Sequence, residues 1–175
     1  ENGRDVDAVE RFSLDLIARK GDCNKITHVS MDMSVTYKKA CELCFPQAKL
    51  VYDHFHVNKL VLDGMDEVRR EEQGKKFARS KSAGRKLLMI PERRMTERQN
   101  EVMQALCQEY PKTGRAFQMV QQFDDLYRCQ TTVEAEAVLK KLTSWMMHSR
   151  LEPMKKVARS LRKNKVEIFE YFKQR

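Results

Sequence analysis

The sequence predicts a short α/β segment followed by an all-α subdomain, so that helix predominates overall. Within residues 1–72, two short apolar runs alternate with helical patterns, and each run ends at an aspartate. From Thr96 onward, apolar residues recur at helical spacing and no strand pattern occurs. A polar, basic stretch with two glycines separates these parts. We therefore expect two domains, residues 1–72 and residues 73–175.

In the first domain the pattern reads helix, strand, helix, strand, helix. Strands joined by a helical crossover pair in parallel, and the connection is right-handed. Two strands alone do not make a stable sheet, so we expect its remainder to come from residues before Glu1 or from another chain. The expected elements are a helix over 5–20, a strand over Ile26–Met31, a helix over Val35–Cys44 capped by Ser34, a strand over Leu50–Tyr52 and a helix from His56 to about Glu72.

The second domain is predicted to be helical. Gln73–Lys86 has the composition of a loop or linker, and Leu87–Ile90 fits either a short strand or a buried extended segment. Two capping boxes, Ser/Thr followed three residues later by Glu/Gln, mark helix starts. They are Thr96 with Gln99 and Thr131 with Glu134; the expected helices are 96–109, 111–128, 131–148 and 153–172, the last broken near Asn164.

Charge and composition restrict the function. The net charge is +9, and residues 69–94 carry ten Lys and Arg against three Glu. Such a block attracts phosphate backbones, although a solvated helical face has the same composition. No apolar run approaches the length of a membrane span and no signal peptide is evident, which argues against membrane and secreted classes. Five cysteines, an odd number, fit reduced thiols in the cytosol.

Two aspartates mark a candidate site. Asp32 follows the first predicted strand, where a carboxylate at the carboxyl edge of a sheet can share Mg²⁺ with a phosphate. Asp53 follows the second strand and could ligate metal, while His56 could touch substrate or orient Asp53. The alternative for both aspartates is helix capping, and for His56 packing in the first helical turn.

Two other groups of residues are candidates for metal or base binding. Cys41 and Cys44 with His54 and His56 could form a zinc set, but the cysteine pair lies in a helical pattern, whereas zinc sites place it on a turn. Trp145 could stack on a base, but its helical spacing also fits the core.

An ordered series of short motifs is shared with a known family. It comprises Ser30–Ser34 (SMDMS), Tyr37–Ala40 (YKKA), Phe45–Ala48 (FPQA), Val51–Leu60 (VYDHFHVNKL) and Asp66–Glu72 (DEVRREE), with further likeness at Glu1–Asp5 and Leu151–Lys156. The series resembles bacterial insertion-sequence transposases of the DDE class, in the ISL-three group, over essentially the whole chain.

This resemblance implies a ribonuclease-H-like domain interrupted by a helical insertion. In such domains three acidic residues hold two divalent metals, Mg²⁺ or Mn²⁺. Asp32 matches the second acid and would be both catalytic and metal-binding. The first would lie upstream of Glu1 and the third downstream of Arg175, so we expect an internal fragment that alone does not cut or join DNA. Asp53 and His56 match a family signature near the site.

The resulting prediction is a parent transposase of the bacterial cytoplasm, associated with the nucleoid. Its partners would be transposon-end and target DNA, with a homodimer as a candidate assembly and no membrane. A non-catalytic DNA-binding or assembly module is the second hypothesis, and a zinc-stabilised interaction domain the third. The residues expected to hold the DNA backbone are Arg69, Arg70, Lys75, Lys76, Arg79, Lys81, Arg85 and Lys86.

Overall fold

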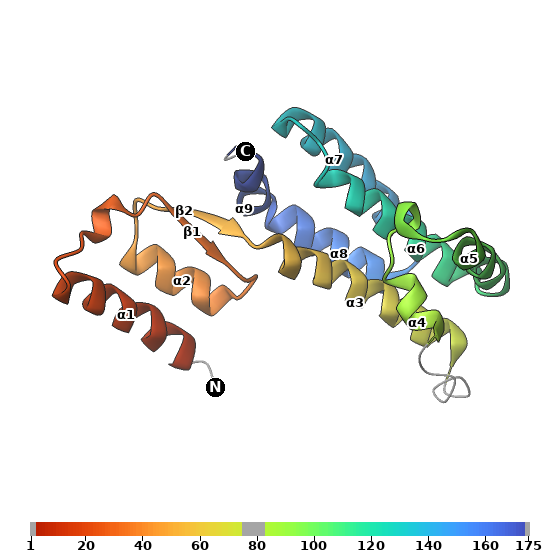
Figure 1. The fold of residues 1–175 in the computed structure, drawn as a ribbon, viewed down its shortest axis with the longest axis horizontal. Helices are drawn as coiled ribbons and strands as arrows, with labels where there is room; N and C mark the ends of the chain where they lie inside the picture. Colours follow the sequence, from red (N-terminus) through yellow and green to blue (C-terminus); the bar gives the residue numbers. More distant parts are fainter. Residues whose placement is uncertain (1–2, 75–82, 174–175) are drawn as a thin grey trace. The chain divides into compact units, whose positions relative to one another are not determined.

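A computed structural model of the chain describes residues 3–74 and 83–173 (Figure 1). Its contacts divide the chain into two compact units. The first unit is Glu1–Val57 together with Lys165–Arg175, and the second is Asn58–Asn164. None of the helices in the described ranges combines the length and apolar composition that a membrane crossing requires.

The first unit is built around two short parallel strands, β1 (His28–Met31) and β2 (Lys49–Tyr52). Helix α2 (Val35–Cys44) connects them and packs against β1 and against α1 (Gly3–Ala18) (Figure 1). The C-terminal helix α9 (Lys165–Glu170) packs on β2. This unit also contains the 3-10 turns η1 (Cys23–Lys25) and η4 (Tyr171–Lys173) and the first turn of α3 (His54–Gln73).

The register of the two strands fixes which residues share the sheet edge. Met31 pairs with Tyr52, so both strands end at the same level and the residues that follow them lie at one edge. The backbone N–H of Asp53 donates to Met31 O at 2.8 Å and extends the ladder by one hydrogen bond. Met31, Val51 and Tyr52 are buried, so the carboxyl ends of both strands belong to the core of this unit.

The second unit is entirely helical in the residues that the structure describes. Its successive helices pack on one another, α4 on α5, α5 on α6, α6 on α7 and α7 on α8 (Figure 1). Apart from most of α3, its elements are α4 (Ala83–Leu88), η3 (Glu92–Arg94), α5 (Glu97–Glu109), α6 (Pro111–Leu126), α7 (Thr132–His148) and α8 (Glu152–Lys163).

Helices α3 and α8 approach closely at a glycine. A Cβ built on Gly64 would lie 2.5 Å from Val157 Cγ2, so only glycine permits this separation of the two helices. The side chains around this contact are fully buried, among them Met65 at 1% and Met154 at 0% exposure. Val57, Val61, Met65 and Val68 lie at helical spacing along α3 and are buried, so this face of the helix belongs to the core.

Most predicted elements are confirmed. Helix α2 has the predicted bounds, and both capping boxes are present with reciprocal hydrogen bonds. The last helix breaks at Asn164, as expected, because α8 ends at Lys163 and α9 begins at Lys165. Trp145 lies on α7 and is half-buried, and Val102 on α5 is 52% exposed.

One segment differs from the prediction. Leu87–Ile90 was expected to be a strand or an extended segment, and residues 83–86 a loop, but Ala83–Leu88 form helix α4. Leu87 and Leu88 are 8% and 2% exposed, because α4 packs on α5. Two adjacent buried leucines give this six-residue helix no apolar periodicity that a sequence pattern can detect.

The units do not coincide with the expected domains. The prediction placed all of α3 with the strands and residues 165–175 with the helical insertion. By contacts, α3 divides after Val57, and Lys165–Arg175 group with the strands. The expected boundary at residue 72 separates a catalytic domain from an insertion, whereas the two units are defined by contacts. The boundary therefore stays a prediction.

Candidate functional site

Asp32 stands directly after β1 and its carboxylate is exposed. Its Oδ1 accepts a hydrogen bond from the backbone N–H of Ser34 at 3.0 Å, and Ser34 Oγ accepts from the N–H of Tyr37 at 3.3 Å as the N-cap of α2. Oδ2 makes no hydrogen bond to any residue in the described ranges. Asp32 therefore helps to start the helix with one oxygen and presents the other to solvent.

Asp53 stands in the equivalent position after β2 and uses both carboxylate oxygens. Oδ1 accepts from the N–H of Phe55 at 3.0 Å, and Oδ2 lies 3.1 Å from Nδ1 of His56. The ring of His56 also packs edge-to-face on Phe55, with centroids 5.5 Å apart. Asp53 thus caps α3 and at the same time fixes the orientation of the imidazole.

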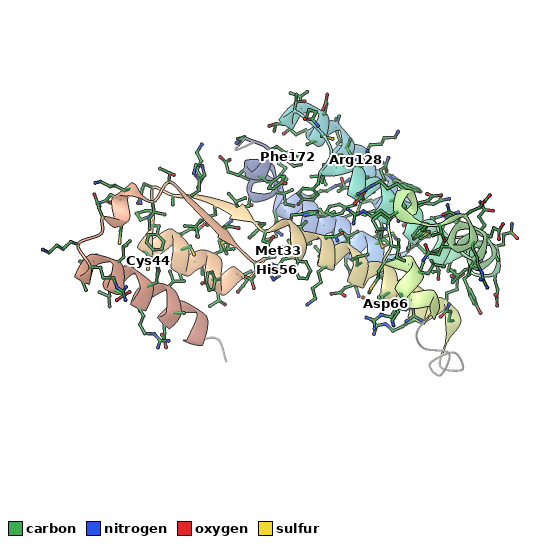
Figure 2. The ribbon with its side chains drawn as sticks, viewed as in Figure 1. Met33, Cys44, His56, Asp66, Arg128 and Phe172 are labelled. Carbon is green, nitrogen blue, oxygen red and sulfur yellow. The ribbon has the colours of Figure 1, made fainter. Side chains whose placement is uncertain are left out.

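The sheet register brings these residues to one edge. Because Met31 pairs with Tyr52, Asp32 and Asp53 both follow the strands at their carboxyl ends. Figure 2 labels Met33, the neighbour of Asp32, and His56 in this region of the first unit. The side chains of Asp53 and His56 are 45% and 42% exposed, respectively. The edge therefore carries two carboxylates and an imidazole within reach of solvent.

Tyr52, the last residue of β2, is buried, and an ion pair lies near it. Burial raises the pKa of Tyr52, and the nearby carboxylates of Glu167 and Asp32 add to the shift. Lys38 on α2 forms an ion pair with Glu167 on α9, and that hydrogen bond raises the pKa of Lys38. Sequence reasoning missed this pair, because Lys38 and Glu167 are far apart in the chain and no motif links them.

The alternative zinc set, against which the helical spacing argued, is not assembled in the described residues. Among the residues that the structure describes, no group of three or more His, Cys, Asp and Glu side chains is placed to hold a metal ion. Cys41 is 1% exposed in the middle of α2, and burial raises the pKa of its thiol, which disfavours the thiolate that zinc requires. The Cys41–Cys44 pair lies on a helix, as its spacing indicated.

Half of the expected DNA-binding residues fall in the described ranges. Arg69 and Arg70 lie on α3, and Arg85 and Lys86 lie on α4. Arg70, Arg85 and Lys86 are exposed, whereas only 18% of the Arg69 side chain is accessible. Lys75, Lys76, Arg79 and Lys81 lie outside the described residues.

The carboxylate of Asp66 is the feature of the second unit that sequence reasoning did not identify as functional. Asp66, labelled in Figure 2, is 9% exposed as a residue, and its carboxylate forms ion pairs with Arg69, Arg70 and Arg85. The spacing of Asp66 to Arg69 and Arg70, three and four residues, could have indicated two of these pairs. Arg85 comes from another helix and could not have been found in this way.

Comparison with known proteins gives a family. A model of the family DDE_Tnp_ISL3, described as a transposase, matches residues 1–175. Neither the curated proteins nor the solved structures gave a match. The family match spans both units, the sheet edge with Asp32 and Asp53 and the helical part with Asp66. The chain belongs to the DDE_Tnp_ISL3 family of transposases.

Proposed function

We propose that this chain forms part of a catalytic domain that cuts and joins DNA strands during transposition, with Asp32 as one of its metal-binding carboxylates. The observation that carries the proposal is the position of Asp32, exposed at the carboxyl edge of a parallel sheet in a chain of a transposase family. Ligands in open α/β folds bind at this edge.

The donor chemistry of the edge fits a hard divalent cation. Mg²⁺ and Mn²⁺ prefer carboxylate oxygens, and Asp32 Oδ2 has no hydrogen-bond partner in the described ranges. Asp32 is therefore the residue that would hold such a cation. In a two-metal site the bound ions supply Lewis-acid activation of the attacking oxygen and stabilise the leaving oxygen.

Asp53 and His56 support the site without acting as its metal-binding acid. Both oxygens of Asp53 are engaged, one with the backbone of Phe55 and the other with His56. We assign Asp53 to orienting the imidazole, so that Nε2 of His56 is available to a phosphate oxygen of the substrate. The pair acts beside the reacting atoms, in the accessory role that its position suggests.

Asp32 alone does not make a two-metal centre. A two-metal centre of this class needs three acids, and Asp32 matches the second of them. We infer that carboxylates elsewhere complete the centre and that the isolated 175 residues do not cut or join DNA. The complete transposase would act in the bacterial cytoplasm on nucleoid DNA, with transposon ends and target DNA as partners and a homodimer as its candidate assembly.

A pair of matched variants tests the role of Asp32. Asp22 also accepts a backbone hydrogen bond two residues ahead, from Asn24 N at 2.9 Å, and is likewise exposed. In a full-length transposase that contains this chain, we expect Asp32→Asn to abolish strand transfer of transposon-end DNA in Mg²⁺ and Asp22→Asn to preserve it. Normal strand transfer by Asp32→Asn would overturn the assignment.

A second function is favoured by the basic character of the second unit: DNA binding without catalysis. We propose that the isolated chain binds duplex DNA through residues 69–94, which contain ten Lys and Arg residues and only three Glu residues. The affinity should fall steeply with salt, with a log–log slope of roughly −0.9 for each phosphate contacted. Binding that is absent, or that does not respond to salt, would refute this function.

A further inference from the structure

Three arginine side chains converge on one buried carboxylate near the end of α3. Asp66 has a side-chain exposure of 12% and lies within ion-pair distance of Arg69, Arg70 and Arg85. Arg69 and Arg70 come from the same helix, whereas Arg85 comes from α4. One carboxylate balances one of the three positive charges, so the cluster keeps a net charge of +2 from these four residues.

Arg69 is the arginine that neutralises Asp66. Its Nε and Nη2 lie 2.9 and 2.8 Å from Oδ1 of Asp66, and its Nη1 donates to Gln73 Oε1 at 2.9 Å. With every nitrogen of the guanidinium engaged and 18% of the side chain accessible, Arg69 has little left for a ligand. Its ion pair with Asp66 offsets the desolvation cost of the buried carboxylate.

Arg70 and Arg85 approach the same carboxylate in a different way. Each comes nearest to the carboxylate through Nε, Arg70 at an ion-pair distance of 3.2 Å from Oδ2 and Arg85 at 3.6 Å from Oδ1. Arg70 Nε also donates a hydrogen bond to the backbone oxygen of Asp66 at 3.3 Å. Their side chains are 64% and 52% exposed. The Nη atoms of both make no hydrogen bond to a residue in the described parts of the chain. Arg70 is therefore held at Nε by a hydrogen bond and an ion pair, and Arg85 by an ion pair alone, and both present their outer donors to solvent.

We propose that Asp66 is a positioning residue that holds Arg70 and Arg85 as a two-arginine clamp for a single phosphodiester group of the DNA backbone. A planar guanidinium donates two parallel hydrogen bonds to phosphate oxygens, and fixing its orientation beforehand reduces the entropy lost on binding. The clamp rests on the proposed DNA-binding function and deepens it, because it separates Arg70 and Arg85, which bind, from Arg69, which supports.

The alternative is that the two exposed arginines only compensate the charge of Asp66. The two explanations predict opposite signs for Asp66→Asn. Removal of a negative charge beside DNA should raise affinity if charge alone matters. If Asp66 positions the clamp, Asp66→Asn should lower it, by roughly three- to tenfold for the loss of one ordered phosphate contact.

Asp63 provides the matched control. It lies on α3 one turn before Asp66 and is exposed. Asp63→Asn removes the same charge without touching the clamp, so duplex binding should stay equal or become tighter. We expect Asp66→Asn to bind more weakly than Asp63→Asn in the same buffer. Equal or tighter binding by Asp66→Asn would overturn the positioning role while leaving DNA binding intact.

A second set of variants avoids the buried residue, in case Asp66→Asn does not fold. Arg70→Lys with Arg85→Lys keeps both charges and removes the forked donors, and we expect a roughly three- to tenfold loss of affinity. Arg70→Gln with Arg85→Gln should reduce the magnitude of the salt slope by about 1, because both residues contact the same phosphate. A reduction of about 2, or no change, would contradict a clamp on one phosphate.

A measurement without DNA separates the clamp from the proposed function. Inorganic phosphate titrated into the isotope-labelled chain should shift the Nε–H resonances of Arg70 and Arg85 and leave that of Arg69 unchanged. Shifts without duplex binding would refute the DNA-binding function and keep the anion site. Duplex binding without these shifts would refute the clamp alone, and the lack of both would refute both.

Discussion

Lys49 Nζ lies 3.2 Å from Glu170 Oε1, and this ion pair joins strand β2 to helix α9. Lys173 Nζ adds a hydrogen bond to Oε2 of the same carboxylate at 2.9 Å. Glu170 is 6% exposed, so its charge is held by two lysines in a largely buried position. The contact fixes the end of the first unit's chain to the strand that precedes Asp53.

Glu170 should make the attachment of α9 sensitive to pH. The hydrogen bond from Lys173 lowers the pKa of Glu170 below its ordinary 4.5, with a further contribution from Lys49. Because the folded pKa is lowered, the stabilisation is present above pH 4.5 and is lost as the pH falls through the folded value. Hydrogen exchange of the α9 amides in the 175-residue chain should show this loss.

The variant Glu170→Gln tests the same contact at neutral pH. We expect amide protection in α9 to fall by roughly tenfold, the effect of losing a charge-assisted hydrogen bond worth about 1.5 kcal/mol. Acidification should then cost the variant less than the wild type. Glu10→Gln, an exposed change on α1, serves as the control and should leave protection unchanged. An identical acid response in wild type and Glu170→Gln would contradict the prediction.

Gly64→Ala should destabilise the second unit. The new Cβ would lie 2.5 Å from Val157 Cγ2, and overpacking of this kind costs about 1–3 kcal/mol of stability. The higher helix propensity of alanine offsets roughly 1 kcal/mol of this cost. Urea denaturation followed by Trp145 fluorescence would measure the change. The double variant with Val157→Ala should be more stable than the sum of the two single changes predicts. Strict additivity would show that the two side chains do not meet.

Glu72 should stabilise the start of α6. Its Oε2 accepts from Thr113 N and Thr113 Oγ1, both at 2.7 Å, and its Oε1 accepts from Lys112 N at 2.9 Å. Thr113 is fully buried, so Glu72→Ala would leave polar groups unsatisfied at a helix N-terminus and cost about 1–3 kcal/mol. Glu71→Ala, at the neighbouring exposed position, should change the unfolding midpoint little. Equal effects of the two variants would refute the capping role.

His56→Ala should slow catalysis in a full-length transposase without unfolding the chain. Residues that hydrogen-bond beside a metal site contribute roughly 10- to 100-fold to activity. We expect the strand-transfer rate to fall by a factor of this size. His28 begins β1 at the opposite end of the sheet from Asp32, and it is exposed. His28→Ala should therefore retain activity. A strand-transfer rate for His56→Ala within about twofold of wild type would remove His56 from the accessory site.

Local features of the fold could be predicted from the sequence. Ser34 and the capping boxes at Thr96 and Thr131 are recognised within four residues of each helix start, and all three form the expected caps. The alternation of helix and strand up to residue 72 also follows from local periodicity. The aspartates after each strand could be placed at one edge, because parallel strands joined by a helix have little freedom of register.

Contacts between distant residues could not be predicted. Helix α4 exists because Leu87 and Leu88 are buried by α5, and the sequence around them carries no helical pattern. Helix α9 was predicted to belong to the helical insertion, but it packs in the first unit. Two ion pairs hold it there, Lys38–Glu167 and Lys49–Glu170. Such pairs form between residues that only the tertiary fold brings together, so the local sequence around each residue does not indicate them.

The sequence by itself determined the caps, the two aspartate-ended strands and the likeness to a transposase family, because these depend on residues close together or on an ordered series of motifs. Only the tertiary structure decided which carboxylates are engaged. It placed Arg85 beside Asp66, turned Arg69 inward and left Asp32 Oδ2 without a partner in the described ranges. The physical reason is that a side chain's charge is fixed by its type, whereas its availability depends on which neighbours folding brings within hydrogen-bond distance.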